Sequence, residues 1–174
     1  MLIKKLILLT TILFFQSTNT PPKEKLNLYK KAGISSYFEL NYPLAIRKLG
    51  YVIRYKPDDP EPYYYRALSK YGMENFSSAV FDLNKAIELD STKAEYHFAK
   101  GQALYSMRKF EEAIFALNKS IKLDQNNGVA YYIRASCHKH EGNLMGTCED
   151  LFEAYDLNVE KAEKKIKKYC KADD

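Results

Sequence analysis

Apolar and small residues recur along this chain with a period of 34 positions. Residues 83–90 read LNKAIELD, and residues 117–124, which lie 34 positions further on, read LNKSIKLD. Within a period the apolar positions step by three and four residues, as at Phe76, Ala79 and Leu83. That spacing places their side chains on one face of an α-helix. The pattern therefore predicts an all-α chain made of repeated amphipathic helices.

Several columns of the repeat keep one kind of side chain through four periods. They are an aromatic or histidine column (Tyr29, Tyr63, His97, Tyr131), a small column (Gly33, Ala67, Gly101, Ala135) and a leucine column (Leu49, Leu83, Leu117, Leu151). Small residues such as Gly101 and Ala113 on facing helices allow two backbones to approach closely. We expect helices at about 26–40, 43–55, 60–73, 77–90, 94–107, 111–124, 128–141 and 145–157, each end to within about two to four residues.

Residues that start helices stand where the second helix of each pair is expected to begin. Asn41, Asn75 and Asn143 are placed so that a side-chain oxygen can accept from free backbone N–H groups. Pro43 falls in the first turn of a helix, where its missing N–H is tolerated. Since one such helix pair cannot bury its apolar stripe alone, the pairs are expected to stack.

This pattern resembles the tetratricopeptide repeat over four units, 26–59, 60–93, 94–127 and 128–161. The third unit matches the aromatic, small and alanine positions best, with Gly101, Tyr105, Phe110, Ala113 and Leu117. Leu40 replaces the usual inter-helix glycine of the first unit, and Thr147 replaces the small alanine of the fourth. The resemblance implies a right-handed superhelical solenoid of about four helix-turn-helix repeats.

A further helix over residues 159–171 is expected to cap the solenoid, before a short tail at 172–174. Its apolar stripe consists of Val159, Ala162, Ile166, Tyr169 and Cys170, and its polar face of Lys161, Lys164, Lys165, Lys167, Lys168 and Lys171. A terminal repeat needs such a polar outer face to stay soluble. Contact of the lysines with anionic lipid is the alternative.

The first twenty residues have the composition of a secretory signal peptide. A short positive start is followed by an apolar run at 6–15 and by polar residues at 16–20, and residues 21–25 would form a linker. We therefore expect an exported protein, periplasmic or secreted. The alternative is an uncleaved N-terminal anchor on a cytoplasmic adaptor, with membrane contact through this segment.

Composition argues against two classes of function. The formal net charge is +5, which is too mild and too dispersed for a nucleic-acid surface. We find no glycine-rich phosphate loop and no recognisable catalytic motif, and so expect no enzyme activity and no cofactor. Tyrosine is abundant, at 15 residues, and tyrosine rings are favoured at protein-binding surfaces.

In the resembling family the first helix of each pair lines a concave groove that binds a protein or peptide. By register, the groove residues here would be Lys30, Ile34, Tyr37, Phe38, Tyr64, Leu68, Tyr71, Phe98, Gln102, Tyr105, Tyr132, Ser136, Lys139 and His140. Several of these rings would alternatively only pack between repeats. The Lys, Asn and Arg clamp for a C-terminal carboxylate is incomplete, because Ile34 stands at the asparagine position.

The three cysteines leave two further hypotheses open. Cys137 opens the segment Cys137–Glu141, which holds two histidines, and a metal- or haem-binding site there with Cys148 is an alternative to the expected absence of metal. In an oxidising compartment one pair can form a disulfide. The expected pair is Cys148 and Cys170, because the end of the cap should pack over the last unit.

Overall fold

The structure is a computed structural model that describes residues 21–170. The predicted signal peptide and tail lie outside these residues. The described part contains nine α-helices and no strand: α2 (Lys23–Phe38), α3 (Tyr42–Tyr55), α4 (Pro60–Gly72), α5 (Phe76–Leu89), α6 (Ala94–Ser106), α7 (Phe110–Leu123), α8 (Gly128–His140), α9 (Leu144–Asp156) and α10 (Lys161–Tyr169). The predicted all-α solenoid of four helix pairs with a capping helix is confirmed.

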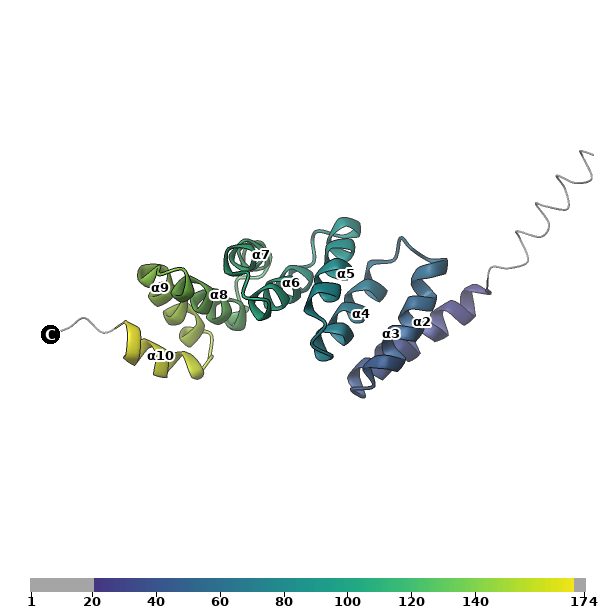
Figure 1. The fold of residues 1–174 in the computed structure, drawn as a ribbon, viewed down its shortest axis with the longest axis horizontal. Coiled ribbons are helices and arrows are strands. Elements are labelled where there is room, and N and C mark those ends of the chain that lie inside the picture. The colour runs from purple at the N-terminus through teal and green to yellow at the C-terminus, as the bar shows by residue number, and fades with distance from the viewer. Residues whose placement is uncertain (1–20, 171–174) are drawn as a thin grey trace, which may run out of the picture.

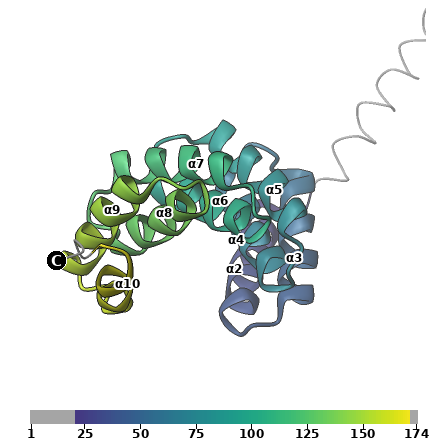
Figure 2. The same cartoon turned by 60° about the vertical axis from the view of Figure 1, so that its left-hand side comes forward.

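The helix pairs stack side by side into a curved row, with α2 near one end and α10 at the other (Figure 1). Each second helix packs against the first helix of the next pair, and α2, α4, α6 and α8 also contact one another in turn. Turning the molecule shows an arc in which α4, α6 and α8 lie on the inner side and α5, α7 and α9 on the outer side (Figure 2). The first helices therefore line the concave face, as the resemblance implies.

Close packing of a small residue against a leucine holds each pair together. Leu49, Leu117 and Leu151 are fully buried. A Cβ atom added to Gly101 would lie 2.6 Å from Cγ of Leu117, and one added to Gly33 would lie 2.8 Å from Cγ of Leu49. Both distances are shorter than real side-chain contacts, so the glycine is what admits the leucine here. The predicted role of the small column is confirmed at these positions.

A buried carboxylate in the second pair forms a network that the sequence analysis missed. Asp82 is fully buried, and Arg66 donates to it twice, from Nε to Oδ2 at 2.7 Å and from Nη2 to Oδ1 at 2.6 Å. Lys70 adds an ion pair of 2.7 Å. A charge so deeply buried is tolerated because it is fully paired.

The same network recurs 68 residues later, in the fourth pair. Arg134 donates twice to Asp150, at 2.8 and 2.5 Å, and His138 stands 3.8 Å from the same carboxylate. Arg134 also donates to Oδ1 of Asn118, on α7, at 2.7 Å. This contact ties the fourth pair to the third. The signal in the sequence was an Arg and an Asp 16 positions apart, occurring twice at twice the repeat length.

The turns inside the pairs follow the predicted caps. Side chains of Asn41, Asn75 and Asn143 accept from the backbone N–H three residues on, at 3.3, 3.3 and 3.0 Å, so those caps are confirmed. In every pair, the residue directly before the N-cap of the second helix has its backbone in the left-handed region. These residues are Leu40 (φ 58°), Glu74 (φ 61°), Arg108 (φ 60°) and Gly142 (φ 76°). Only the fourth position carries the glycine that this conformation favours.

Three expectations need correction. α2 begins at Lys23, so residues 23–25 are helical and not linker: Pro22 fixes the backbone before the helix, and Glu24 in the first turn favours its start. The capping helix is shorter than 159–171, because Asn158 takes a left-handed turn with φ 65° before it. Lys165 does not lie on a purely solvated face, because it bonds to α8.

We predict that Glu74→Gly stabilises the protein by about 0.5–1 kcal/mol. Glycine removes the strain of the left-handed conformation, which outweighs its greater freedom in the unfolded chain. Urea unfolding measures the effect. The matched control is Gly142→Ala, which should destabilise by a similar amount, and equal stability of all three proteins would contradict the assignment.

We predict that Asp82→Ala destabilises by about 3–5 kcal/mol, because Arg66 and Lys70 lose their buried partner. The control is Glu112→Ala, which breaks the exposed pair between Lys109 and Glu112 at 2.8 Å. That change should cost less than about 1 kcal/mol. Thermal unfolding of the two variants side by side decides the point.

Candidate functional site

Aromatic rings on the inner helices form a connected series. The ring of Tyr37, on α2, lies 5.6 Å from that of Tyr65, on α4. Tyr65 lies 5.2 Å from Tyr64, and Tyr64 lies 4.8 Å from Tyr96, on α6. Phe38 is 68% exposed and also contacts Tyr65 at 6.0 Å. Three successive pairs are thus joined by neighbouring rings, only some of which the sequence analysis had placed in the groove.

The other predicted groove residues of α4 and α6 are half-buried and take part in packing. The hydroxyl of Tyr71 lies 3.1 Å from Oγ of Ser106, on the next first helix, and its ring lies 5.2 Å from Phe76. Tyr105 packs against Phe110 at 5.9 Å, Phe98 packs on the same core, and Leu68 packs on the core of the second pair. Gln102 is half-buried on α6. These side chains therefore pack between repeats and are also partly exposed on the inner face.

Acidic neighbours engage Lys30 at the N-terminal end of this face. Its Nζ lies 2.8 Å from Oδ2 of Asp59 and 2.5 Å from Oε2 of Glu61. Burial alone would lower the pKa of Lys30, but the hydrogen bonds that its ammonium donates to Asp59 and Glu61, together with their negative charge, outweigh burial and raise the pKa. The ammonium is therefore charged and already paired. Lys30 is therefore not free to bind a partner's carboxylate, and Ile34, at the asparagine position of the clamp, offers no polar group either.

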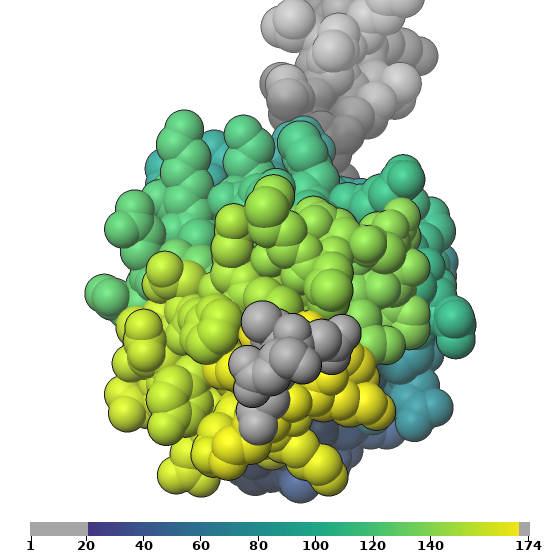
Figure 3. Space-filling model, turned by 90° about the vertical axis from the view of Figure 1, so that its left-hand side faces the viewer, coloured from purple at the N-terminus to yellow at the C-terminus, as the bar shows by residue number. Residues whose placement is uncertain are grey.

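At the C-terminal end, α10 reaches onto residues that the sequence analysis placed in the groove. Lys165 donates to Oγ of Ser136 at 2.8 Å, and its Nζ lies 4.1 Å from the ring centre of Tyr132. Nζ of Lys139 lies 4.9 Å from the ring of Tyr169. Figure 3, which looks onto this end of the molecule, shows α10 packed across it. The cap thus occupies the last part of the inner face as well as closing the core.

A small hollow opens between the starts of α4 and α6. It encloses about 280 Å³ and is lined by Pro60, Glu61, Tyr64, Tyr65, Asp90, Lys93, Glu95 and Tyr96. Burial, with a smaller effect of Glu95, raises the pKa of Tyr64 well above its usual range and that of Tyr96 to about 12. Burial also raises the pKa of Tyr65, so all three tyrosines are neutral phenols at physiological pH. The repeat register could have found this site, because Glu61 and Glu95 are 34 positions apart.

A larger hollow of about 1000 Å³ lies elsewhere, between α2, α3 and the side chain of Arg66. Tyr29, Tyr51 and Arg54 are among its walls, and the rings of Tyr29 and Tyr51 lie 4.7 Å apart. No predicted groove residue lines it. It is therefore a feature of the edge of the first pair and not of the inner face.

The segment Cys137–Glu141 does not converge on a common point. Cys137 is fully buried, and burial raises its pKa to about 12. His138 faces Asp150, whereas the ring of His140 stacks on Phe110 at 4.2 Å. Among residues 21–170, no three His, Cys, Asp or Glu side chains are grouped so that they could hold a metal ion. The side chains of Cys137, His138 and His140 are therefore directed to different neighbours and are not gathered around one point.

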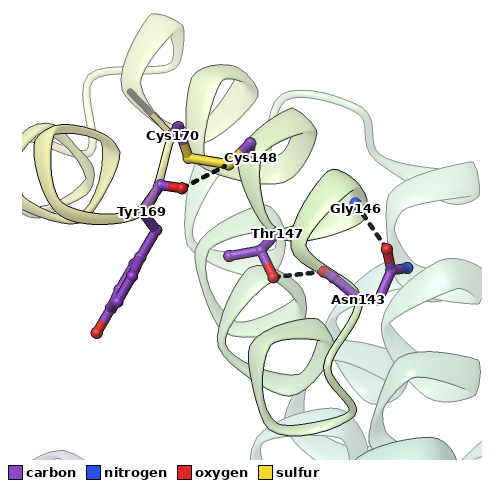
Figure 4. The surroundings of a disulfide bond; sticks show 6 residues. All are labelled: Asn143, Gly146, Thr147, Cys148, Tyr169 and Cys170. Carbon is purple, nitrogen blue, oxygen red and sulfur yellow. Dashed lines mark hydrogen bonds between the residues drawn. A yellow bond between two sulfur atoms is a disulfide. The ribbon is translucent and has the colours of Figure 1, made fainter. Parts of the chain in front are cut away.

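The structure joins Cys148, on α9, to Cys170, directly after α10 (Figure 4). Their Cα atoms are 5.5 Å apart, within the range that a disulfide requires. Close by, Oγ1 of Thr147 donates to the backbone oxygen of Asn143 at 2.7 Å. That bond satisfies the hydroxyl and explains how threonine fits in a column of alanines.

In the described part of the chain, none of the helices combines the length and the apolar content that a membrane span requires.

Comparison with known proteins identifies the fold. Residues 39–120 match the family model described as anaphase-promoting complex, cyclosome, subunit 3. A search of curated proteins gave no significant match. Among solved structures, the chain is similar to the crystal structure of the MamA protein, with a TM-score of 0.77, 22% identity, and 82% of this chain and 79% of that chain covered.

Two further similar structures concern peptide binding. The first tetratricopeptide-repeat domain of Spaghetti (RPAP3), bound to the HSP90 peptide SRMEEVD, has a TM-score of 0.67 at 21% identity, covering 71% of this chain and 98% of that one. YrrB, described as a tetratricopeptide-repeat protein with an unusual peptide-binding site, has a TM-score of 0.73 at 20% identity, covering 82% and 74%. The resemblance seen in the sequence is thereby confirmed: the chain has the tetratricopeptide-repeat fold.

We predict that thiol alkylation at pH 8 separates the three cysteines. The oxidised native protein should take up no label, and the reduced native protein should label Cys148 and Cys170 only. Cys137 should react only after unfolding, because a buried thiol with a pKa of about 12 holds almost no thiolate at this pH. Mass spectrometry of the labelled peptides measures this, and rapid labelling of native Cys137 would contradict it.

Proposed function

We propose that this tetratricopeptide-repeat solenoid is a non-enzymatic scaffold that binds a segment of a partner protein on its concave face. The observation that carries the proposal is the connected series of rings from Tyr37 through Tyr65 and Tyr64 to Tyr96. It joins the first helices of three successive pairs, α2, α4 and α6, which line the concave face, and ends on the buried ring of Tyr96. The peptides bound by proteins of the same fold support a partner of this kind.

Physical chemistry favours this face for recognition. Tyrosine offers a large rigid contact area at a low entropic cost together with a hydroxyl for hydrogen bonds. The rings are held by their neighbours before any partner arrives, so little order has to be created on binding. Because the inner helices present polar side chains between the rings, such as Gln102 and Ser106, a partner's backbone can also be hydrogen-bonded.

The proposal assigns no catalytic role to the cysteine and histidine segment. Cys137 is a buried neutral thiol, and His138 is held between Asp150 and Asn143, so neither is positioned to attack a substrate. The binding function also does not use an acidic C-terminal tail, because Lys30 is already paired with two carboxylates.

We further propose that the protein acts outside the cytoplasm, in the periplasm or the medium. The signal-like first twenty residues support this, and so does a disulfide between Cys148 and Cys170, which persists in an oxidising compartment. The competing hypothesis is a membrane-anchored cytoplasmic adaptor. N-terminal sequencing of the protein from its own cells decides, since a start near Thr18–Pro21 means cleavage and a start at Met1 means retention.

We predict that substitutions on the inner face abolish partner capture. In-cell crosslinking of the native chain is compared with Gln102→Arg, and with Tyr64, Tyr71 and Tyr105 all changed to Ala. Each groove variant should lose at least about tenfold in recovered partner, which corresponds to about 1.4 kcal/mol. Gln102→Arg is included because the triple variant also removes packing contacts.

The matched control is Phe115→Ser on the outer side, where the ring is 66% exposed. It should capture the same partner as the native chain. Circular dichroism verifies that every variant keeps its helices. Equal capture by the native protein and by both groove variants would place the binding surface elsewhere.

A further inference from the structure

The hollow between α4 and α6 has a composition that suits a cation. Three carboxylates, those of Glu61, Asp90 and Glu95, line it against a single ammonium, that of Lys93. Glu61 is partly compensated by Lys30, at 2.5 Å. Asp90 accepts two hydrogen bonds from Thr92, but neither Asp90 nor Glu95 has an ion-pair partner among residues 21–170, so the hollow carries a negative field. Their effect is visible in the hollow itself, since Glu95 and Asp90, after burial, raise the pKa of Tyr96.

Three aromatic rings complete the walls. Tyr64 lies 4.8 Å from Tyr96 and 5.2 Å from Tyr65, so the rings form a cluster at one side of the carboxylates. Tyrosine faces attract ammonium and guanidinium groups, and the attraction grows when the cation is partly desolvated. Tyr96 is only 5% exposed, so its ring forms the inner wall of the cluster. An aromatic wall beside carboxylates is complementary to a side chain that has an apolar stem and a positive charge at its end.

The chain contains its own example of this contact at the equivalent position of another repeat. Tyr132, on α8, stands 68 positions after Tyr64, which is twice the repeat length. Nζ of Lys165, from α10, lies 4.1 Å from the ring centre of Tyr132 and also donates to Ser136. In the fourth repeat, α10 thus places a lysine ammonium over the ring of Tyr132. The second repeat has the same ring in the same register, and among residues 21–170 no lysine or arginine lies over it.

Helix geometry explains only part of this arrangement. Glu61 and Glu95 each stand in the first turn of a helix, where a carboxylate is favoured by the helix dipole. That explanation does not require three tyrosines beside them or a hollow of about 280 Å³ in front of them. The volume is below that of a typical small-molecule site and is sufficient for one long side chain.

We propose that this hollow binds the Lys or Arg side chain of the partner segment that occupies the concave face. The partner is then a basic segment, with one cationic residue anchored between Tyr64, Tyr96 and Glu95. The identity of the occupant as a partner segment rests on the proposed function. Cation binding by the hollow is a property of the free protein and is measured separately.

The test is an NMR titration of the full chain with N-acetyl-arginine amide and with N-acetyl-lysine amide. N-acetyl-citrulline amide, which has nearly the shape of the arginine compound without its charge, is the control ligand. We expect saturable shifts of the Tyr64 and Tyr96 ring signals with at least one cation and none with citrulline. Increasing salt should weaken the binding, because the attraction is partly electrostatic.

Two charge-changing variants should alter the cation affinity in opposite directions, and a third serves as control. Glu95→Gln should weaken cation binding by about threefold to tenfold, and Lys93→Gln should strengthen it by about twofold to fivefold, because they change the local charge in opposite directions. Glu111→Gln, an exposed change on α7, is the matched control and should leave the affinity unchanged. None of these changes removes a core contact.

Absence of a saturable shift with both cations, or equal shifts with citrulline, would overturn the proposal, as would unchanged affinity in Glu95→Gln. The two proposals fail in different ways. If Gln102→Arg loses its partner while the titrations are negative, the groove stands and the cation site falls. If the titrations are positive while groove variants still capture the partner, the cation site stands and the groove function falls.

Discussion

The architecture depends on how closely the two helices of each pair can approach. Where Gly101 meets Leu117, and where Gly33 meets Leu49, even one added carbon would overlap the leucine. This contact fixes the separation of the helices within a pair and so fixes the surface that the next pair meets. The other two pairs have Ala67 and Ala135 at this position, so in all four pairs a small residue faces a leucine, and stacking of such similar pairs gives a curved row. The concave face is therefore a consequence of packing inside the pairs, and no residue on that face is needed to produce it.

The buried ion networks join the two helices of a pair, and one of them also joins two neighbouring pairs. They occur only in the second and fourth pairs, around Asp82 and Asp150, while the equivalent positions of the other two pairs hold no such carboxylate. Arg134 reaches from one pair to Asn118 of the one before. An arginine held at both ends by fixed partners defines the register of two pairs more sharply than apolar contact does. The network around Asp150 therefore also holds the fourth pair against the third.

The sequence predicted the features that recur in every repeat unit and missed the contacts that join one unit to another. The repeat of 34 residues gave the helices, the small column and the Asn caps, because each of these is a property of one unit. Contacts such as that between Tyr64 and Tyr96, or between Lys165 and Tyr132, join different units. Their existence depends on the rotation from one pair to the next, which no single unit encodes. The same reason explains why the inner position of Lys165 was read as part of a solvated face.

The capping helix both buries the core at the end of the solenoid and places a positive charge on the inner face. The last pair has no neighbour, so α10 must bury the apolar core there, which it does with Ala162 and Ile166. Because α10 is short and rich in lysine, it also brings an ammonium onto the ring of Tyr132. The inner face is consequently positive at its C-terminal end, near Lys139 and Lys165, and negative around Glu95. A face with opposite charges at two positions along its length favours one direction of a bound segment, because reversing the segment would place like charges together.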